Sequence, residues 1–184
     1  MTESSKAETA DTRRTARILE AATGLYLAYG ARRTSMDDIA NEAGMAKGSL
    51  YLSFKSKDEL FHALIENLLH QWLAAARSRL MAETGIVEKL VAYLDEAIGE
   101  PARLLRSTPH AVDLLEAKGR LAAKLLSTYR QDVAHDLSAL LADRPSMQPL
   151  VIEAAYGCRE TGDMESDAYR KRLSRHIAAL LDPR

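Results

Sequence analysis

The stretch TSMDDIANEAGMAKGSLYLSFKSKDEL, residues 34–60, decides the fold that the sequence predicts. Its first half carries one apolar stripe with the i, i+3, i+4, i+7 spacing of a helix, formed by Met36, Ile39, Ala40 and Ala43. Ser35 and Asp38 have the spacing of a capping box, and Gly44 follows where helices end in a residue that tolerates positive φ. This half therefore predicts a short helix that ends in a glycine turn.

The second half of the stretch predicts another short helix, with a thin apolar face made by Leu50 and Phe54. The side chains around that face are small, polar or cationic, namely Lys47, Gly48, Ser49, Tyr51 and Ser53. Such a surface packs poorly in a core but fits a DNA groove lined with hydrogen-bond acceptors and phosphates. Ser56 and Glu59 form a second capping box at the start of a longer helix. The stretch thus predicts a helix-turn-helix that lies on DNA.

A set of residues at fixed spacing carries a resemblance to a known family: Ile39-Ala40, Ala43-Gly44, Gly48, Leu50-Tyr51, Phe54 and Lys57 to Leu60. They resemble the DNA-binding domain of the TetR family of bacterial transcription regulators. Two positions depart from the family pattern. Met45-Ala46 stands where Val-Ser or Val-Thr is usual, and Ser53 stands where a His or Tyr often occurs. These departures bear on which operator is read rather than on how DNA is bound.

The resemblance and the residue types together define a set of candidate DNA-binding residues: Thr34, Ser35, Met36, Lys47, Gly48, Ser49, Tyr51, Ser53 and Lys57. Residues 47–49 begin the recognition helix and are expected to face base edges, with Gly48 permitting close approach of the backbone. Tyr51 and Lys57 are expected to hold phosphates, by hydroxyl and by charge beside a helix N-terminus. Residues 34–36 lie where the family usually touches the DNA backbone; for Thr34 and Ser35, simple helix capping is an equally weighted alternative.

Composition is consistent with this interpretation. The chain has 184 residues, 47% of them hydrophobic, and a formal net charge of −1. Basic residues nevertheless outnumber acidic ones between residues 13 and 57, as phosphate contact requires. No apolar run is long enough to cross a bilayer, and the N-terminus lacks the apolar core of a secretory signal. The single cysteine, Cys158, excludes an intrachain disulfide framework and predicts a cytoplasmic protein.

The whole chain is predicted to be all-α. Residues 1–11 are polar and predicted to be disordered, residues 12–60 form an N-terminal three-helix domain with the helix-turn-helix, and residues 61–184 form a C-terminal helical bundle for ligand binding and dimerisation. Beyond the helix-turn-helix, helices are expected at residues 57–83, 86–98, 102–106, 118–143, 150–160 and 166–181, with one more beginning near Pro109. The same periodicity predicts buried positions on the first and fourth helices at Tyr26, Tyr29, Leu60, Leu64, Leu68, Trp72 and Leu80.

The resemblance also implies a partner and an effector. In the TetR family the last two helices of each subunit pair with their mates, which places a homodimer interface in residues 150–181 and predicts a near-palindromic double-stranded operator. A small molecule of unknown identity is expected to bind the C-terminal bundle and release the DNA. Candidate ligand-binding residues are Trp72, Tyr93, His110, Leu114 and Tyr129. For each of them ordinary core packing is the favoured alternative.

Two other classes of function compete with this one. An enzyme of the di-metal bundle class would use pairs such as Asp132 and His135, but a second such pair is missing. His62 and His70 lie two turns apart, too far for a simple shared metal. We therefore expect no catalytic residues, no metal and no cofactor. A helix-turn-helix regulator or activator that needs no ligand is the remaining alternative.

Overall fold

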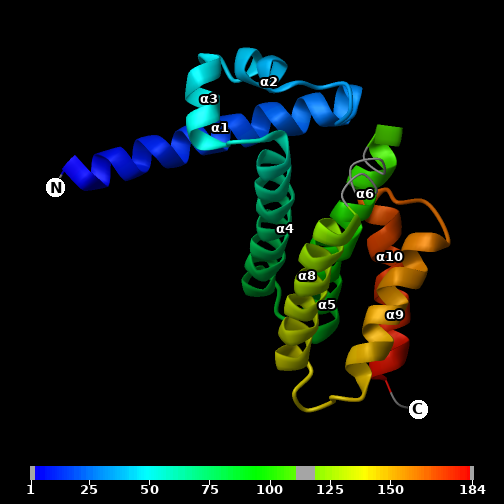
Figure 1. Ribbon diagram of the computed structural model, residues 1–184. Helices are drawn as coiled ribbons and strands as arrows, with labels where there is room; N and C mark the ends of the chain where they lie inside the picture. Colours follow the sequence, from blue (N-terminus) through cyan, green and yellow to red (C-terminus); the bar gives the residue numbers. More distant parts are fainter. Residues whose placement is uncertain (1–2, 111–118, 183–184) are drawn as a thin grey trace. The chain divides into compact units, whose positions relative to one another are not determined.

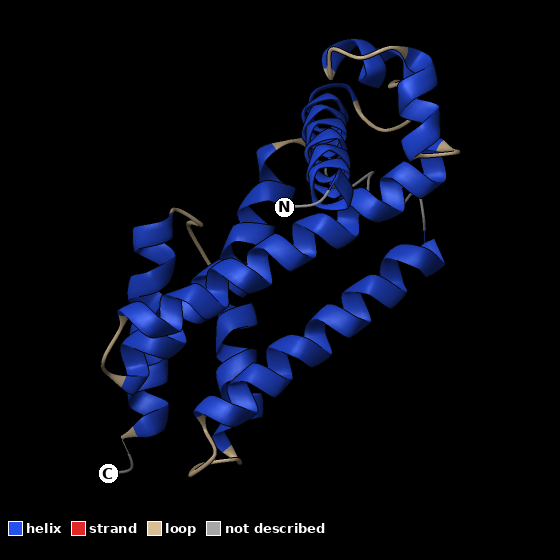
Figure 2. Cartoon of the chain, turned by 90° about the vertical axis from the view of Figure 1, so that its left-hand side faces the viewer, coloured by secondary structure: helices blue, strands red, loops and turns tan. Residues whose placement is uncertain are grey.

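The computed structural model describes residues 3–110 and 119–182, and the ordered elements among them are all helices (Figures 1 and 2). They are α1 (Glu3–Tyr29), α2 (Met36–Glu42), α3 (Lys47–Ser53), α4 (Lys57–Ala82), α5 (Ile86–Leu94), a π-helical segment (Asp95–Gly99), α6 (Glu100–Ser107), α8 (Gly119–Leu140), α9 (Met147–Glu160) and α10 (Ser166–Leu181). The described residues contain no strand, which confirms the predicted all-α class.

Helix α1 begins at Glu3 and so includes residues 3–11, a segment that the sequence analysis predicts to be disordered. The segment is polar, but five of its nine residues are Glu, Lys or Ala, which favour a helix. Arg14 also pairs with Asp11 at 3.7 Å, one turn away. Low apolar content indicates that a segment does not form a packed core. It does not exclude a helix that extends from a helix whose other end is packed in a core.

The chain divides into two compact units, and the division differs from the predicted one at residue 60. The first unit comprises residues 1–67 and 108–122, and the second comprises residues 68–107 and 123–184. Residues 108–110 are therefore grouped with the helix-turn-helix, whereas the sequence analysis places them in the C-terminal bundle. Thr108 donates a hydrogen bond from its hydroxyl to the carbonyl of Leu27 at 3.0 Å, which ties this segment to the end of α1.

The core of the first unit lies between α1, the helix-turn-helix and the start of α4 (Figure 1). Its fully buried side chains include Ile18, Ala22, Tyr26, Ile39, Leu50 and Leu60. The rings of Tyr26 and Phe61 lie 6.2 Å apart at 45°. Tyr26 is therefore core, as predicted. Tyr29 is 59% exposed, because it is the last residue of α1 and points away from this core, so its predicted burial is wrong.

The buried stripe of α4 in the second unit lies one residue further along than predicted. Leu69, Leu73 and Ala76 are buried, whereas Leu68, Trp72 and Leu80 are only half-buried. Apolar residues stand at 68 and 69 and again at 72 and 73, so periodicity alone does not select between the two stripes. The remaining core of this unit is formed by α5, α8, α9 and α10, and α10 packs on both α9 and α5. No described helix is long and apolar enough to span a membrane.

Candidate nucleic-acid interface

Helix α2 begins with the predicted capping box. The Asp38 backbone N–H donates to the Ser35 hydroxyl oxygen at 3.1 Å, and the Ser35 backbone N–H donates to the Asp38 carboxylate at 2.8 Å. Hydrogen bonds from the Ser35 hydroxyl and backbone lower the pKa of the Asp38 carboxyl. Two orphan donors are thereby satisfied, and the position at which the helix starts is fixed.

The turn after α2 depends on Gly44, which has a φ of +62°. Met45 donates from its backbone to the Ala40 carbonyl at 2.9 Å, so the chain reverses within a few residues. Arg17 of α1 donates to the Ala43 carbonyl at the end of α2, where a cation complements the helix dipole. A side chain at Gly44 would strain the backbone and would come within 3.2 Å of that guanidinium. The turn and α1 therefore hold α3 in a fixed orientation.

Helix α3 presents one buried and one exposed face. Leu50 is fully buried and Phe54, directly after the helix, is buried too. Lys47, Gly48, Tyr51 and Leu52 are exposed, and together we call them the α3 outer face. A Cβ built at Gly48 would meet no described atom within 4 Å beyond its own helix backbone and chain neighbours. An approaching ligand surface would therefore reach the backbone of α3 at this point.

The first residue of α3 is held by an ion pair across the helix-turn-helix. Lys47 Nζ lies 2.8 Å from a carboxylate oxygen of Asp37 in α2, and 6.0 Å from the centre of the Tyr51 ring. The hydrogen bond to Asp37 and its negative charge raise the pKa of Lys47. Both side chains are more than half exposed, so water screens the pair and phosphate can displace Asp37 at little cost. Lys47 is thus oriented on the outer face.

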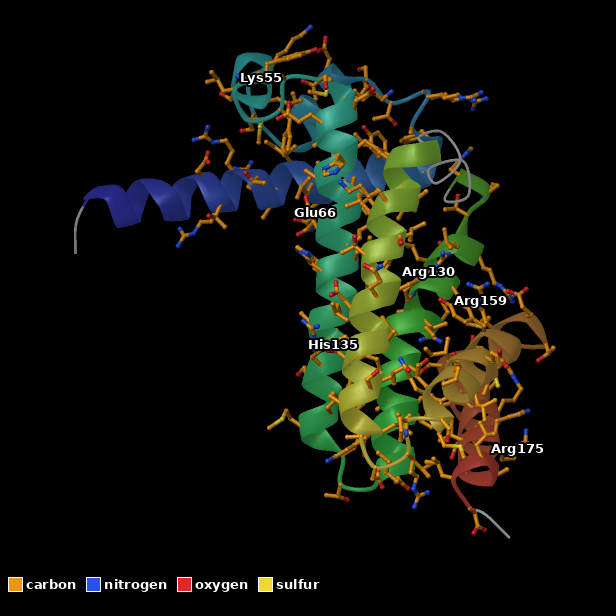
Figure 3. All side chains as sticks on the ribbon, turned by 60° about the horizontal axis from the view of Figure 1, so that its bottom comes forward. Lys55, Glu66, Arg130, His135, Arg159 and Arg175 are labelled. Carbon is orange, nitrogen blue, oxygen red and sulfur yellow. The ribbon has the colours of Figure 1, made fainter. Side chains whose placement is uncertain are left out.

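Helix α4 begins with the second predicted capping box, in a modified form. The Glu59 backbone N–H donates to the Ser56 hydroxyl at 3.1 Å, and the Glu59 carboxylate accepts from the backbone of Lys55, not of Ser56, at 2.7 Å. Lys55, labelled in Figure 3, is exposed beside α3, and the half-buried Lys57 is the first residue of α4. Two cations therefore flank the point where α3 gives way to α4.

Three of the predicted DNA-binding residues have side chains that are wholly or partly buried. Thr34 is buried and donates from its hydroxyl to the Gly30 carbonyl at 3.1 Å, so it closes the turn after α1. Met36 is buried in the core. The Ser53 hydroxyl is buried and has no hydrogen-bond partner in the described part of the chain. The N-cap of α2 is Ser35 and not Thr34, whose hydroxyl bonds to the turn before the helix. Ser35 is exposed but serves as the cap of α2, and Ser49 is half-buried.

Sequence reasoning also missed residues that share the surface. Leu52 is 71% exposed on the α3 outer face, although its residue type alone gives no reason to set it apart from Leu50. Asp37 was not expected to orient Lys47, because residues ten apart in different helices give no local signal. The spacing of the inward-facing residues in α3 would have identified Leu52 as exposed. Leu50 and Phe54 define the inward side, and a position two residues from Leu50 then faces outward.

Comparison with known proteins identifies this segment. Residues 18–64 match the model of the bacterial regulatory proteins of the tetR family. The chain carries a TetR-family DNA-binding domain. It is 33% identical over 84 residues to YfiR, an uncharacterized HTH-type transcriptional regulator of Bacillus subtilis, which is 46% of this chain and 40% of the relative. It is 40% identical over 78 residues to the regulator TtgR of Pseudomonas putida, covering 41% of this chain and 36% of TtgR.

The chain thus spans about two fifths of the length of these two relatives. Solved structures share the fold over far more of the chain. A TetR transcription regulator of Haloarcula marismortui aligns with a TM-score of 0.71 and 17% identity over 91% of this chain and 98% of that one. The FadR regulator of Bacillus subtilis in complex with stearoyl-CoA aligns with a TM-score of 0.62 and 18% identity over 88% and 98%. The TetR-like architecture therefore extends beyond the DNA-binding domain.

The residues predicted to bind a ligand fall in both units of the chain. Trp72, Tyr93 and Tyr129 belong to the second unit, His110 belongs to the first, and Leu114 lies outside the described residues. Tyr93 donates from its hydroxyl to Asp136 at 2.8 Å, and Tyr129 donates to the Ala97 carbonyl at 2.8 Å. Burial is the main cause that raises the pKa of both phenols. Both tyrosines therefore serve as polar anchors of the core.

Metal ligands and nucleophilic thiols are two further kinds of site that His and Cys side chains can form. No group of three or more His, Cys, Asp or Glu residues there is placed to hold a metal ion. His135, labelled in Figure 3, is exposed on α8. Cys158 is buried, which raises the pKa of its thiol, and its sulfur lies 3.7 Å from Nδ1 of His176. A buried thiol of raised pKa is a poor nucleophile.

The start of α3 lacks a side-chain cap, and this leads to a first prediction. Ala46 occupies the N-cap with φ −66° and ψ 141°, a conformation that suits serine. Ala46→Ser is expected to raise the free energy of unfolding by about 1 kcal/mol, because the new hydroxyl would accept an orphan N–H of the first turn. Urea unfolding measures this. Ala142→Ser, at an exposed turn position, is the control and should change stability by less than about 0.5 kcal/mol.

Proposed function

We propose that this protein is a sequence-specific DNA-binding transcriptional regulator that places α3 in the major groove. The observation that carries the proposal is the α3 outer face, where Lys47 and Tyr51 flank the open backbone of Gly48. An α-helix fits the major groove, and close approach lets short side chains reach base edges. Lys55 and Lys57 supply cations for the phosphates beside it.

A single helix of seven residues makes few base contacts, so we propose that two copies bind a near-palindromic operator as a homodimer. The proposed interface is formed by α9 and α10, within residues 150–181. Leu150 is exposed, and Ile152 and Tyr156 are half-buried, so α9 retains apolar surface for a partner to cover. Sedimentation equilibrium of the free protein tests this step, and a monomer at micromolar concentration would contradict it.

We further propose that the regulator acts in the cytoplasm as a repressor and that a small molecule relieves repression. A relative in Mycobacterium tuberculosis is named the transcriptional repressor KstR2, and the FadR structure with the same fold is in complex with stearoyl-CoA. The ligand must bind the released state more tightly than the DNA-bound state. Trp72, Tyr93 and Tyr129 stay the candidates in the second unit, with His110 and Leu114 in the segment that follows α6. No metal, cofactor or catalytic role is proposed.

The alternative is a regulator or activator that responds to no ligand. One observation favours it: the hydroxyls of Tyr93 and Tyr129 already bond to acceptors of the protein, so their polar tips are not free to fix a ligand. Thermal unfolding in a panel of acyl-CoA thioesters and apolar drug-like molecules distinguishes the two. A ligand that raises the melting temperature and weakens operator binding supports the repressor, and the absence of any such molecule favours the alternative.

The experiment that tests the proposed function is selection of bound fragments from random duplex DNA at physiological salt, followed by footprinting. We expect a two-fold-symmetric site protected over one to two helical turns. Binding with no enrichment of any sequence over non-specific DNA would contradict a sequence-specific regulator. The selected operator then serves for every binding measurement described below.

The open surroundings of Gly48 lead to a prediction in which stability and binding change in opposite directions. Gly48→Ala is expected to raise the free energy of unfolding by about 0.5–1 kcal/mol, because alanine favours the helix and meets no described side chain. Operator affinity should fall about tenfold or more, the scale of one lost base contact, because the methyl group keeps α3 away from the bases. Urea unfolding and fluorescence anisotropy measure the two effects.

Gly24 provides the matched control for this variant. It lies in α1, is exposed, and also has open space around an added Cβ. Gly24→Ala should stabilise the protein by a similar amount and leave operator affinity unchanged. If Gly48→Ala bound the operator as tightly as Gly24→Ala, the α3 outer face would not approach DNA at Gly48.

A further inference from the structure

Leu52 is the large apolar residue of the α3 outer face. Its side chain is 71% exposed, and it stands one helical turn after Gly48. At 100° per residue the two positions lie about 40° apart around the helix axis, so they share one side of α3. A single exposed leucine on a protein surface has no special meaning. Leu52 differs from such a residue because it lies on the helix that is proposed to enter DNA.

The neighbours of Leu52 are suited to contacts of a different kind. Lys47 and Tyr51 offer an ammonium group and a phenol, which bind phosphates or base acceptors. Leu52 offers only a branched alkyl group, which binds neither. The one apolar group that base pairs present in the major groove is the 5-methyl group of thymine. An alkyl side chain that enters the groove therefore matches thymine in preference to the other bases.

We propose that Leu52 is a specificity-determining residue that packs against a thymine 5-methyl group in each half-site of the operator. This inference rests on the proposed function, since it requires α3 to enter the major groove. It goes beyond the presence of a DNA-binding domain, because it predicts that the operator carries thymine at one position of each half-site. Contact between the two apolar groups removes both from water and supplies the preference.

The test replaces each thymine of the selected half-site, one at a time and in both half-sites, with deoxyuridine. This removes only the methyl group and keeps the base pair. We expect one position at which the wild-type protein loses about fourfold in affinity per half-site, the scale of one buried methyl group. Leu52→Ala should bind the thymine and deoxyuridine operators equally at that position. Leu52→Met, which keeps an apolar contact, should keep the sensitivity.

Met81→Ala is the matched control, because Met81 is an apolar residue that is 90% exposed and lies in α4, outside the interface. It should keep the full response to deoxyuridine. Melting temperatures of the variants show that each is folded. The inference is overturned if no thymine position responds, or if Leu52→Ala responds as the wild type does. Failure to select any operator would overturn the proposed function itself, and is thereby distinguished from failure of this inference alone.

Discussion

Asp95→Ala is expected to lower the free energy of unfolding by about 3–5 kcal/mol, because it removes the buried carboxylate partner of Arg103 and leaves that cation with Glu100, a carboxylate that is 45% exposed. The Asp95 side chain is 7% exposed and lies 2.7 Å from Nη2 of Arg103, whose own side chain is 18% exposed. Its other carboxylate oxygen accepts from the Ser166 hydroxyl at 2.9 Å. After the substitution Arg103 keeps Glu100, the Met164 carbonyl and, at 3.5 Å, the backbone carbonyl of residue 95 as near partners. Urea unfolding followed by circular dichroism measures the loss.

Two variants show whether burial causes the effect. Asp143→Ala removes a carboxylate that is 78% exposed and lies 3.5 Å from Arg144, and it should change stability by less than about 1 kcal/mol. Asp95→Ala combined with Arg103→Met removes both buried charges and should recover much of the lost stability. The prediction is contradicted if Asp95→Ala lowers the free energy of unfolding by no more than Asp143→Ala does. Solvent would then have to screen the Asp95–Arg103 ion pair.

This ion pair could not be predicted from the sequence, and the reason is physical. Residues 86–98 show a regular helical pattern, whereas the structure has α5 followed by a π-helical segment, Asp95–Gly99. A π-helical segment adds one residue to a turn, which apolar periodicity does not register. The Ala97 carbonyl in this segment accepts from Tyr129, and Gly99 has no side chain where a Cβ would lie 2.6 Å from Asp95 Oδ1. The π-helical segment is therefore stabilised in part by a residue far from it in sequence.

The helix-turn-helix was predicted well because its signals are local. Capping pairs at positions 35/38 and 56/59, the positive φ of Gly44 and the inward Leu50 all act within a few residues of one another. The DNA-facing residues were harder to predict, because the same residue types cap helices and bind phosphates. Thr34 is the example: its hydroxyl closes a turn inside the unit, and only the three-dimensional structure distinguishes this from a DNA contact.

Alkaline pH is expected to unfold the protein cooperatively above about pH 10, because four tyrosines are buried as neutral phenols. Burial, with a smaller contribution from Asp58, raises the pKa of Tyr26 to about 12. Burial is also the main cause that raises the pKa of Tyr93, Tyr129 and Tyr169. In the unfolded chain a tyrosine ionises near pH 10. The stability linked to these residues is therefore fully present below pH 10 and is lost as the pH rises further.

The steepness of this loss follows from the number of protons that only the folded state retains. Each buried tyrosine contributes about 1.4 kcal/mol per pH unit above the unfolded pKa, and four together contribute roughly 5 kcal/mol per pH unit until Tyr26 itself ionises. A typical stability of about 5–15 kcal/mol would then be exhausted within one to three pH units. Circular dichroism and tyrosinate absorbance, recorded on the same samples, should show the four phenols ionising together with the loss of helix.

Tyr26→Phe separates this linkage from other alkaline effects. The Tyr26 hydroxyl is buried and has no hydrogen-bond partner among the described residues, so its removal should leave stability at neutral pH unchanged or slightly higher. The variant should also unfold less steeply with pH, by about 1.4 kcal/mol per pH unit, because one fewer phenol stays protonated in the fold. Ionisation of all seven tyrosines with the helices intact would contradict the prediction, since it would require the buried phenols to reach water without unfolding.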